Sequence, residues 1–409
     1  MNNIAISFSS GKYSSLLFWN LCKYLILIDT INGFCIEYGI PFPIGQIYKF
    51  VLLFFIIINL FRFPKGRVIV TFSLIYLLTY INFLLTNTYS QFIAESVILF
   101  SKFLIVPLML FYLFELQKVS NPTWFWNNAV KVLKFNLFFL CANVFSGLIG
   151  IGTHSYDESI GYKGFLYAIN EISGLGIVLF CFFIYYSNII YSKKNFIVTC
   201  CILIATTILL GTKTLLISLL LALYYLPSIT LHSNKKSFRI YRFLIILASL
   251  CLLIYGGYTL LNNIGFLDRW IYFYDKGGLE QIIFSGRNLY WLEEKKFFYS
   301  SDFLVRLFGL GENRTVEIDP FDTLLNFGYI GIFLIYSFYI SLIIKSYKLR
   351  NEYNISKLIF FINLLLMIAS SFAGHIIFSG MLGPFIAILN SLIRIPNNVI
   401  YKNTSHRKA

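Results

Sequence analysis

The chain has 409 residues, of which 58% belong to the AVILMFWYC set, 19% are aromatic and only 12% are charged. A soluble domain carries roughly 25% charged residues, so this composition excludes a cytosolic enzyme, a disordered scaffold and a secreted disulfide domain. The formal net charge is +15, from 33 Lys and Arg against 18 Asp and Glu. The sequence therefore indicates a polytopic membrane protein, whose basic residues are first to be tested as topology signals.

Long uncharged segments predict an all-α bundle of about twelve transmembrane helices, with eleven to thirteen as the range. A bilayer core about 30 Å thick needs roughly 20 apolar residues per helix, and the strict period-two alternation of a membrane β-barrel is absent. The expected spans cover residues 14–36, 44–62, 67–86, 92–115, 130–150, 166–191, 195–211, 213–230, 240–260, 321–344, 356–378 and 380–396.

The positions of the cations predict the orientation of the bundle. With both termini in the cytoplasm, the cytoplasmic segments hold 21 of the 33 cations, whereas the short external turns hold only Lys163 and Lys213. This is the positive-inside pattern, which explains the basic balance without nucleic acid. The expected organisation is an N-terminal bundle of about nine helices over 1–261, an external loop over 262–320, C-terminal helices over 321–396 and a basic cytoplasmic tail over 397–409.

The expected external loop, 262–320, is the only long polar segment. It mixes seven cations and nine acids with many aromatic residues. This mixture predicts a folded cap or short helices at the membrane interface rather than a disordered linker. No internal repeat is evident, so an inverted-repeat transporter gains no support.

Two cationic motifs are candidates for binding an anion. In Ser285-Gly286-Arg287 the guanidinium offers a planar fork of donors suited to phosphate oxygens; the alternative is a solvated loop arginine. Lys213 follows Gly211-Thr212 between two apolar runs. It either faces a polar cavity and an anion or extends to water from a tight external turn.

Three carboxylates follow one another at the start of the expected tenth span: Glu317, Asp319 and Asp322. One of them is a candidate for a base, and together they are candidates for binding Mg²⁺. The structural alternative is a helix start, with Asp319 as the cap, Pro320 at the first helical position and Asp322 in the first turn. Because that alternative leaves Glu317 unexplained, Glu317 is the preferred base.

Further polar residues fall at or inside the expected spans. Asn170 and Glu171 lie near the outer end of the sixth span, where a buried Glu must be paired or neutral. His375 is a lone histidine near the outer end of the eleventh span, either packed or functional. Other charged residues within spans are expected to pair between helices: Lys23, Asp29, Lys49, Glu95 and Lys102.

A series of short motifs carries a resemblance to a known family. These motifs cover residues 211–216, 285–287 with Trp291, 307–311, 317–319 and 328–331, with 164–165, 170–171 and 373–375 as further landmarks. In this order and spacing they resemble the O-antigen polymerase and O-antigen ligase-like superfamily.

The resemblance implies a bacterial inner-membrane glycosyltransferase that needs no metal or cofactor and whose donor is a glycan on undecaprenyl pyrophosphate. A polymerase moves the growing chain onto the next lipid-linked repeat unit, whereas a ligase moves it onto lipid A-core. The ligase branch has a histidine near the place of Glu317, so the sequence favours a polymerase. A flippase and a chain-length regulator are the implied partners. The alternative from another class is a transporter of lipid-linked oligosaccharides.

A mechanism follows as a hypothesis. The leaving pyrophosphate needs fixed cations, and Arg287 and Lys213 are the candidates, with Arg314 in support. Glu317 is the expected base for the acceptor hydroxyl, with Asp319 as the alternative. The remaining substrate-binding candidates are Asn170, Glu171 and His375.

Overall fold

The computed structural model describes residues 2–40, 42–86, 93–156, 161–230, 266–310 and 315–405. Two expectations from the sequence, the span over 240–260 and the role of Arg314, lie outside these ranges.

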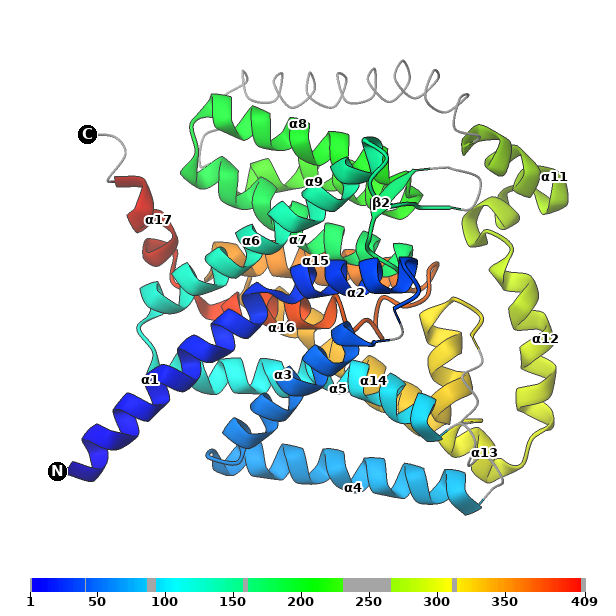
Figure 1. Cartoon of the computed structure of the whole chain (residues 1–409), viewed down its shortest axis with the longest axis horizontal. Coiled ribbons are helices and arrows are strands. Elements are labelled where there is room, and N and C mark those ends of the chain that lie inside the picture. The colour runs from blue at the N-terminus through cyan, green and yellow to red at the C-terminus, as the bar shows by residue number, and fades with distance from the viewer. Residues whose placement is uncertain are drawn as a thin grey trace.

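The described chain consists almost entirely of helices (Figure 1). The first half contains α1 (Asn2–Lys23), α2 (Leu25–Glu37), α3 (Ile44–Leu60), α4 (Pro64–Thr86), α5 (Ile93–Val119), α6 (Pro122–Leu148), α7 (Ile169–Ile190), α8 (Lys193–Leu210) and α9 (Lys213–Thr230). A two-stranded antiparallel hairpin, β1 (Thr153–His154) and β2 (Tyr162–Gly164), lies between α6 and α7. The second half contains α11 (Phe266–Phe284), α12 (Arg287–Ser300), α13 (Phe303–Phe308), α14 (Asp319–Leu349), α15 (Asn354–Ser370), α16 (Gly383–Ser391), the 3₁₀ turn η2 (Leu392–Arg394) and α17 (Asn397–Ser405).

Several of these helices are long and apolar enough to cross a bilayer. Six pass on their own (α4, α5, α6, α7, α8 and α14), and α1 with α2, a pair bent by 45°, makes a seventh if the two helices form one span. The other apolar helices are shorter: α3, α9, α15 and the segment Gly383–Arg394. The structure thus agrees with an all-α membrane protein, while the count of twelve spans and the side of each loop stay predictions.

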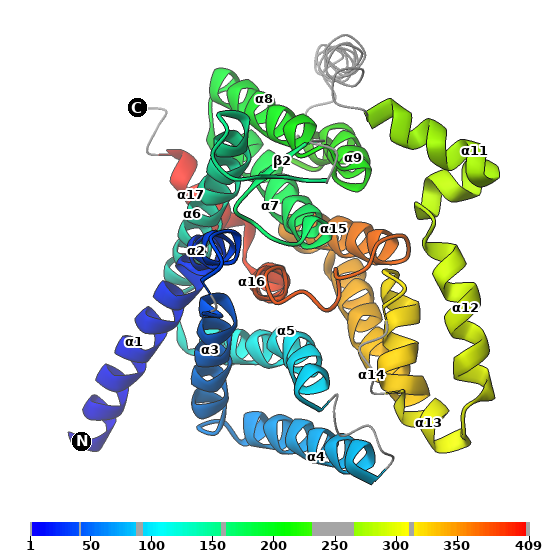
Figure 2. The same cartoon turned by 45° about the vertical axis from the view of Figure 1, so that its right-hand side comes forward.

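Helix α7 is the centre of the bundle. Every residue from Ile172 to Ser187 is buried, because α7 packs against α9, α15 and α8 and lies beside α16 (Figure 2). The sequence allows this: no charged residue follows Glu171 until Lys193, and a helix that is apolar all round is a buried helix. Glu171 therefore enters the bundle at the first turn of α7.

The break between α1 and α2 at Tyr24 is compensated by a buried amide from α6. Asn136 Oδ1 accepts a hydrogen bond from the Ile26 amide at 3.0 Å, and its Nδ2 donates to the Cys22 carbonyl at 3.2 Å. The Asn136 side chain is fully buried. Backbone groups released by a kink in an apolar environment need such partners, so Asn136 makes the bend possible.

The last two expected spans differ from the structure. The sequence predicted helices over 356–378 and 380–396, whereas α15 ends at Ser370 and α16 begins only at Gly383. Residues 371–382 form an irregular segment, which we call the bridging loop. Its backbone amide groups bond to carboxylates of other helices, as described below, and this removes the need for helical hydrogen bonds there.

Residues 266–308 form an arm of three helices, α11, α12 and α13, along one flank of the bundle (Figures 1 and 2). The described part of the expected external loop is thus helical, as its composition predicted. The arm is fastened to α14 by Trp291, whose ring stacks on Phe321 with centroids 4.1 Å apart and planes 3° from parallel.

The role of Asn136 gives a test of the bend. We expect Asn136→Leu to lower the free energy of unfolding by about 1–3 kcal/mol, because the Ile26 amide and the Cys22 carbonyl lose a buried partner. Asn128→Leu is the control, since within the described residues the Asn128 side chain bonds only to Trp124 of its own helix. Thermal unfolding in detergent measures both; equal stability of the two variants would contradict the assignment.

Candidate functional site

Arg287 owes its position to a left-handed turn between two helices of the arm. Ser285 has φ 54° and Gly286 has φ 83°, and this pair ends α11 and starts α12. Arg287 is therefore the first helical residue of α12. Its side chain therefore leaves the first turn of α12, an end at which the helix dipole favours an anion.

The guanidinium of Arg287 joins the arm to two other segments. Its Nε and Nη2 each lie 2.9 Å from Glu317 Oε2, and Nη1 donates to the Phe372 carbonyl at 3.3 Å. The Arg287 side chain is 16% exposed, whereas that of Glu317 is 49% exposed. The arginine is thus held in place by partners, while part of the Glu317 carboxyl group remains accessible.

Lys213 reaches the same turn from the bundle. It begins α9, directly after the turn at Gly211 and Thr212 that the sequence predicted as a break. Its ammonium donates to Ser285 Oγ at 2.7 Å, to the Ile283 carbonyl at 3.1 Å and to the Ile282 carbonyl. A cation at the last carbonyls of α11 is favourable. Lys213 therefore binds the arm next to Arg287 instead of extending to water.

The three clustered carboxylates point in different directions. Glu317 faces Arg287, whereas Asp319 is fully buried and its Oδ2 accepts from the amides of Ile376 and Ile377 at 2.9 and 2.7 Å. Asp322 Oδ1 accepts from the Val316 amide at 2.5 Å. No group of three metal-ligating side chains forms within the described residues.

The helix-start prediction at this place is only partly right. Pro320 lies at the first turn of α14 and Asp322 follows in that turn, as expected. However, the cap residue is Ile318 and makes no side-chain cap bond, so the prediction that Asp319 caps the helix is wrong. The physical reason is the bridging loop, whose two amides compete for the Asp319 carboxylate and bind it.

His375, in the bridging loop, lies between the charged groups of the site. Burial lowers the pKa of the His375 imidazole below its ordinary value. The carboxylates of Glu171 and Glu317 raise this pKa, but the effect of burial is larger. Its neighbour Gly374 touches Glu317 so closely that an added Cβ would lie 2.6 Å from the Glu317 Cα. His375 is therefore close to Glu317 and neutral at neutral pH.

Backbone strain is concentrated at this place. Within the described chain, three residues other than glycine have positive φ: Ser285, Glu317 at 59° and His375 at 65°. Each such conformation costs about 1–3 kcal/mol and is typical of functional sites. All three belong to the Arg287 cluster, which we define as Lys213, Ser285, Arg287, Glu317 and His375.

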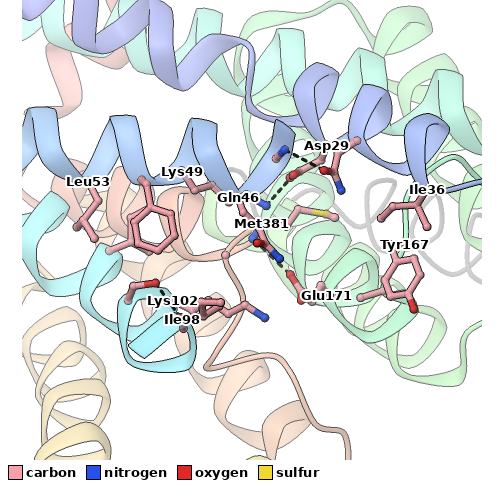
Figure 3. Close-up of a pocket in the computed structure, with 17 residues that line it drawn as sticks. Asp29, Ile36, Gln46, Lys49, Leu53, Ile98, Lys102, Tyr167, Glu171 and Met381 are labelled. Carbon is pink, nitrogen blue, oxygen red and sulfur yellow. Dashed lines mark hydrogen bonds and ion pairs between the residues drawn. The ribbon is translucent and has the colours of Figure 1, made fainter. Parts of the chain in front are cut away.

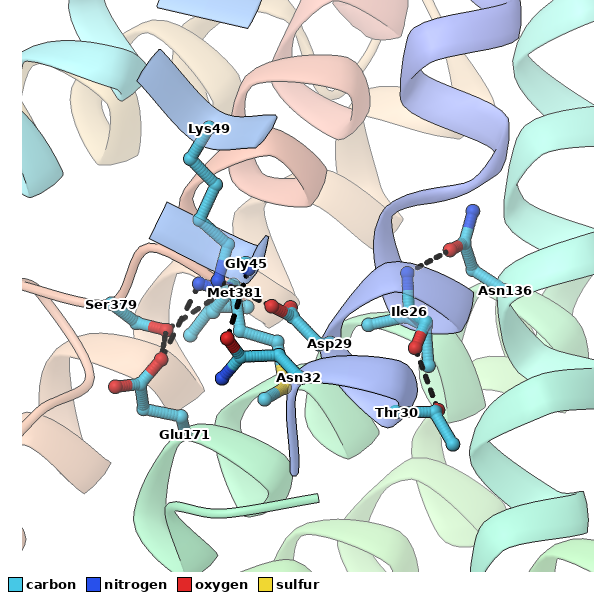
Figure 4. A network of polar contacts seen from close by, with 11 residues as sticks. Ile26, Asp29, Thr30, Asn32, Gly45, Lys49, Asn136, Glu171, Ser379 and Met381 are labelled. Atoms are coloured by element: carbon cyan, nitrogen blue, oxygen red, sulfur yellow. Dashed lines mark hydrogen bonds and ion pairs between the residues drawn. The ribbon is translucent and has the colours of Figure 1, made fainter. Parts of the chain in front are cut away.

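A second polar cluster surrounds a cavity of about 440 Å³ between α2, α3, α5, α7 and the end of the bridging loop (Figure 3). Lys49 pairs with Asp29 at 2.6 Å. Glu171 Oε2 accepts from Ser379 Oγ at 2.5 Å and from the Met381 amide at 3.3 Å (Figure 4). The expected pairing between helices is thus confirmed for Asp29 and Lys49, whereas Lys102 forms no ion pair within the described residues.

The sequence predicted a functional role for only one of the four charged residues that line this cavity. It named Glu171, but it gave Asp29, Lys49 and Lys102 no role beyond pairing, although charged residues in apolar spans are a signal of function. Asn170 precedes Glu171 in α7 and does not line the cavity.

The glycine-rich landmarks of the sequence shape the fold near the site. Gly309 and Gly328 both have positive φ, and an added Cβ on Gly328 would lie 2.4 Å from the Leu307 carbonyl oxygen. The Leu310 amide donates to the Leu325 carbonyl at 2.7 Å. The motifs at 307–311 and 328–331 thus meet where α13 packs on the break in α14, and they position the arm.

Comparison with protein-family models, curated proteins and solved structures finds no match for this chain.

The carboxylate of Asp319 is testable as a positioning group. We expect Asp319→Ala to lower the free energy of unfolding by about 1–3 kcal/mol, because two buried amides of the bridging loop lose their acceptor. Thermal unfolding in detergent measures this. Wild-type stability in that variant would show that the loop does not depend on Asp319.

His375 predicts a pH dependence of stability. Its pKa is lower in the folded state, so below about pH 6.5 the unfolded chain binds a proton that the folded chain does not. Stability therefore falls as the pH falls, by up to about 1.4 kcal/mol per pH unit. His375→Asn, whose side chain tolerates positive φ, should lose less stability than the wild type between pH 7 and pH 5. Parallel curves for the two proteins would contradict a buried neutral His375.

Proposed function

We propose that this chain is a glycosyltransferase of the O-antigen polymerase type, which joins undecaprenyl-pyrophosphate-linked repeat units at the periplasmic face of the bacterial inner membrane. The observation that supports this proposal is the meeting of Lys213, Arg287, Glu317 and His375 from four distant segments of an apolar helical bundle.

The cationic side of the Arg287 cluster suits a pyrophosphate leaving group. Arg287 presents a planar fork at the N-terminus of α12, and fixed donors aimed at developing negative charge lower the barrier of a displacement. Lys213 holds the turn that carries Arg287. The pyrophosphate binds at Arg287 in this proposal, with its polyprenyl chain among the apolar helices.

Glu317 suits the role of the base because it is the accessible carboxylate of the three. Without substrate it is paired with Arg287. A pyrophosphate that binds Arg287 replaces Glu317 as the partner of the guanidinium. Glu317 can then accept a proton beside neutral His375. The acceptor hydroxyl then attacks the anomeric carbon, its proton passes to Glu317, and the bond between sugar and pyrophosphate breaks. A single displacement of this kind inverts the anomeric centre.

Two other functions are the alternatives. A ligase that transfers the glycan to lipid A-core would use the same donor site, and Glu317 in place of a histidine favours the polymerase. A transporter of lipid-linked oligosaccharides would use the polar cavity between α2, α3, α5 and α7 as part of its pathway.

Expression in a polymerase-deficient strain that makes the matching repeat unit separates these functions. The polymerase restores a ladder of lipopolysaccharide on gels. Single capped units with no ladder, in cells whose ligase works, would refute the proposal.

Substitutions in the Arg287 cluster give the residue-level prediction. Arg287→Ala should lower polymer formation about 10²–10³-fold by removing charge stabilisation, and Glu317→Gln about 10²–10⁴-fold by removing the base. Arg350→Ala and Glu352→Gln are the controls, since both residues follow the other end of α14: the half-buried Arg350 donates to the Tyr347 carbonyl of that helix, and Glu352 is exposed. Membrane levels of each variant are compared by immunoblot. Full ladders from Arg287→Ala would remove Arg287 from the mechanism, and loss in Asp319→Asn with full ladders in Glu317→Gln would transfer the base role to Asp319.

A further inference from the structure

We propose that the cavity between α2, α3, α5 and α7 is the acceptor-sugar site, in which Lys102 and Glu171 bind the terminal sugar of the acceptor repeat unit. This inference rests on the proposed glycosyl transfer, which needs a second substrate beside the donor.

The cavity has the size and the surface of a saccharide site. Its volume of about 440 Å³ lies within the range of small-molecule pockets, roughly 300–1,000 Å³. Amide and hydroxyl groups of Asn32, Gln46 and Ser101 line it together with the rings of Phe50 and Tyr167. Sugars present hydroxyl groups at their edges and C–H groups on their faces, so polar groups and aromatic rings suit the two kinds of surface.

The charges of the cavity favour a sugar over a pyrophosphate. Its four charged side chains are two acids, Asp29 and Glu171, and two lysines, Lys49 and Lys102, so their formal charges cancel. One lysine is already occupied by the ion pair with Asp29. Two carboxylates in the wall disfavour a multiply charged anion, whereas carboxylates accept hydrogen bonds from hydroxyl groups.

Lys102 is a charged residue of the cavity whose ammonium lacks a partner within the described residues. In the described part of the chain its ammonium makes no hydrogen bond or ion pair, and the aliphatic part of its side chain packs beside Gly380 with that of Lys49. Lys102 and Glu171 line the same space (Figure 3), and no ion pair joins them. A lysine within an apolar helix costs several kcal/mol unless it is paired or hydrated. A hydroxyl or carboxylate oxygen of a sugar between the two side chains would satisfy Lys102, and a sugar hydroxyl would donate to Glu171.

The bridging loop places this cavity next to the Arg287 cluster. Gly380 and Met381 form part of the cavity wall, while His375, five residues before Gly380, lies beside Glu317. The loop bonds to a charged residue of each site: the Phe372 carbonyl accepts from Arg287 at 3.3 Å, whereas Ser379 Oγ and the Met381 amide donate to Glu171. One loop thus contacts Glu317, the proposed base, through Gly374 and forms part of the cavity wall through Gly380 and Met381.

The test measures the binding of two ligands to the purified full-length chain in detergent. The first probe is the soluble saccharide released by mild acid from the lipid-linked repeat unit of the bacterium that carries this chain. The second probe is farnesyl pyrophosphate, a short polyprenyl pyrophosphate. We expect Lys102→Met to weaken saccharide binding tenfold to a hundredfold, as the loss of a charged hydrogen bond does, and to leave farnesyl pyrophosphate binding unchanged. Arg287→Ala should show the opposite pattern.

Two further variants distinguish a loss of binding from a loss of fold. Tyr167→Ala removes a cavity ring that is 68% exposed, so it should weaken saccharide binding without loss of fold. Lys131→Met changes an exposed lysine of α6 and should bind both probes like the wild type. Thermal unfolding verifies that all variants are folded.

The outcomes separate this inference from the proposed function. Saccharide binding that is absent in the wild type, or equal in wild type, Lys102→Met and Tyr167→Ala, would overturn the acceptor site even if the chain restores a polymer ladder. Loss of farnesyl pyrophosphate binding in Lys102→Met would assign the cavity to the donor instead and also overturn it. A missing ladder with Lys102-dependent saccharide binding would refute the polymerase while leaving a saccharide site.

Discussion

The fold around both polar clusters depends on carboxylates that accept hydrogen bonds from an irregular backbone segment inside apolar helices. Peptide groups without helical partners are costly away from water, and the bridging loop, residues 371–382, has such groups. Asp319 at the start of α14 binds the amides of Ile376 and Ile377, and Glu171 at the start of α7 binds Ser379 and the Met381 amide. The loop is therefore tied to two helices at once, and its two ends contact the Arg287 cluster and the cavity.

The Arg287 cluster is held in place by contacts within the protein. Left-handed backbone conformations at Ser285, Glu317 and His375 are unfavourable on their own, so they persist only because surrounding contacts impose them. Lys213 fixes the first turn, and the Arg287 to Glu317 ion pair links the second segment to the arm. In the proposed reaction a pyrophosphate exchanges one partner of the guanidinium for another, so the cationic group needs no rearrangement to receive it.

The sequence was sufficient for the helical class and for most helix positions, because uncharged runs of membrane length have few other structures available. It also named Lys213, Arg287, Glu317 and His375, since each stands out as a charged or titratable group beside apolar segments. The bridging loop was not predictable, because Phe372, Ile376, Ile377 and Phe378 have the composition of a span. The partners of Asp319 lie 57 and 58 residues away, so its preference for them over the cap position of α14 depends on tertiary packing. The cavity was missed for the same reason: Asp29, Lys49 and Lys102 come from three helices whose contacts a single sequence does not specify.

The two polar clusters differ in net charge. This difference bears on how a transferase with two lipid-linked substrates distinguishes one from the other. In the proposed reaction donor and acceptor carry the same pyrophosphate, so a site that selected on that group alone would bind either substrate in either place. The Arg287 cluster sets two cations, Lys213 and Arg287, against the one carboxylate of Glu317, whereas the cavity balances two acids against two lysines. A diphosphate is thereby favoured at the first and disfavoured at the second. In the proposed reaction the cavity binds the acceptor by its sugar end, the bridging loop links that site to Glu317, and the acceptor's own pyrophosphate takes no part in the displacement.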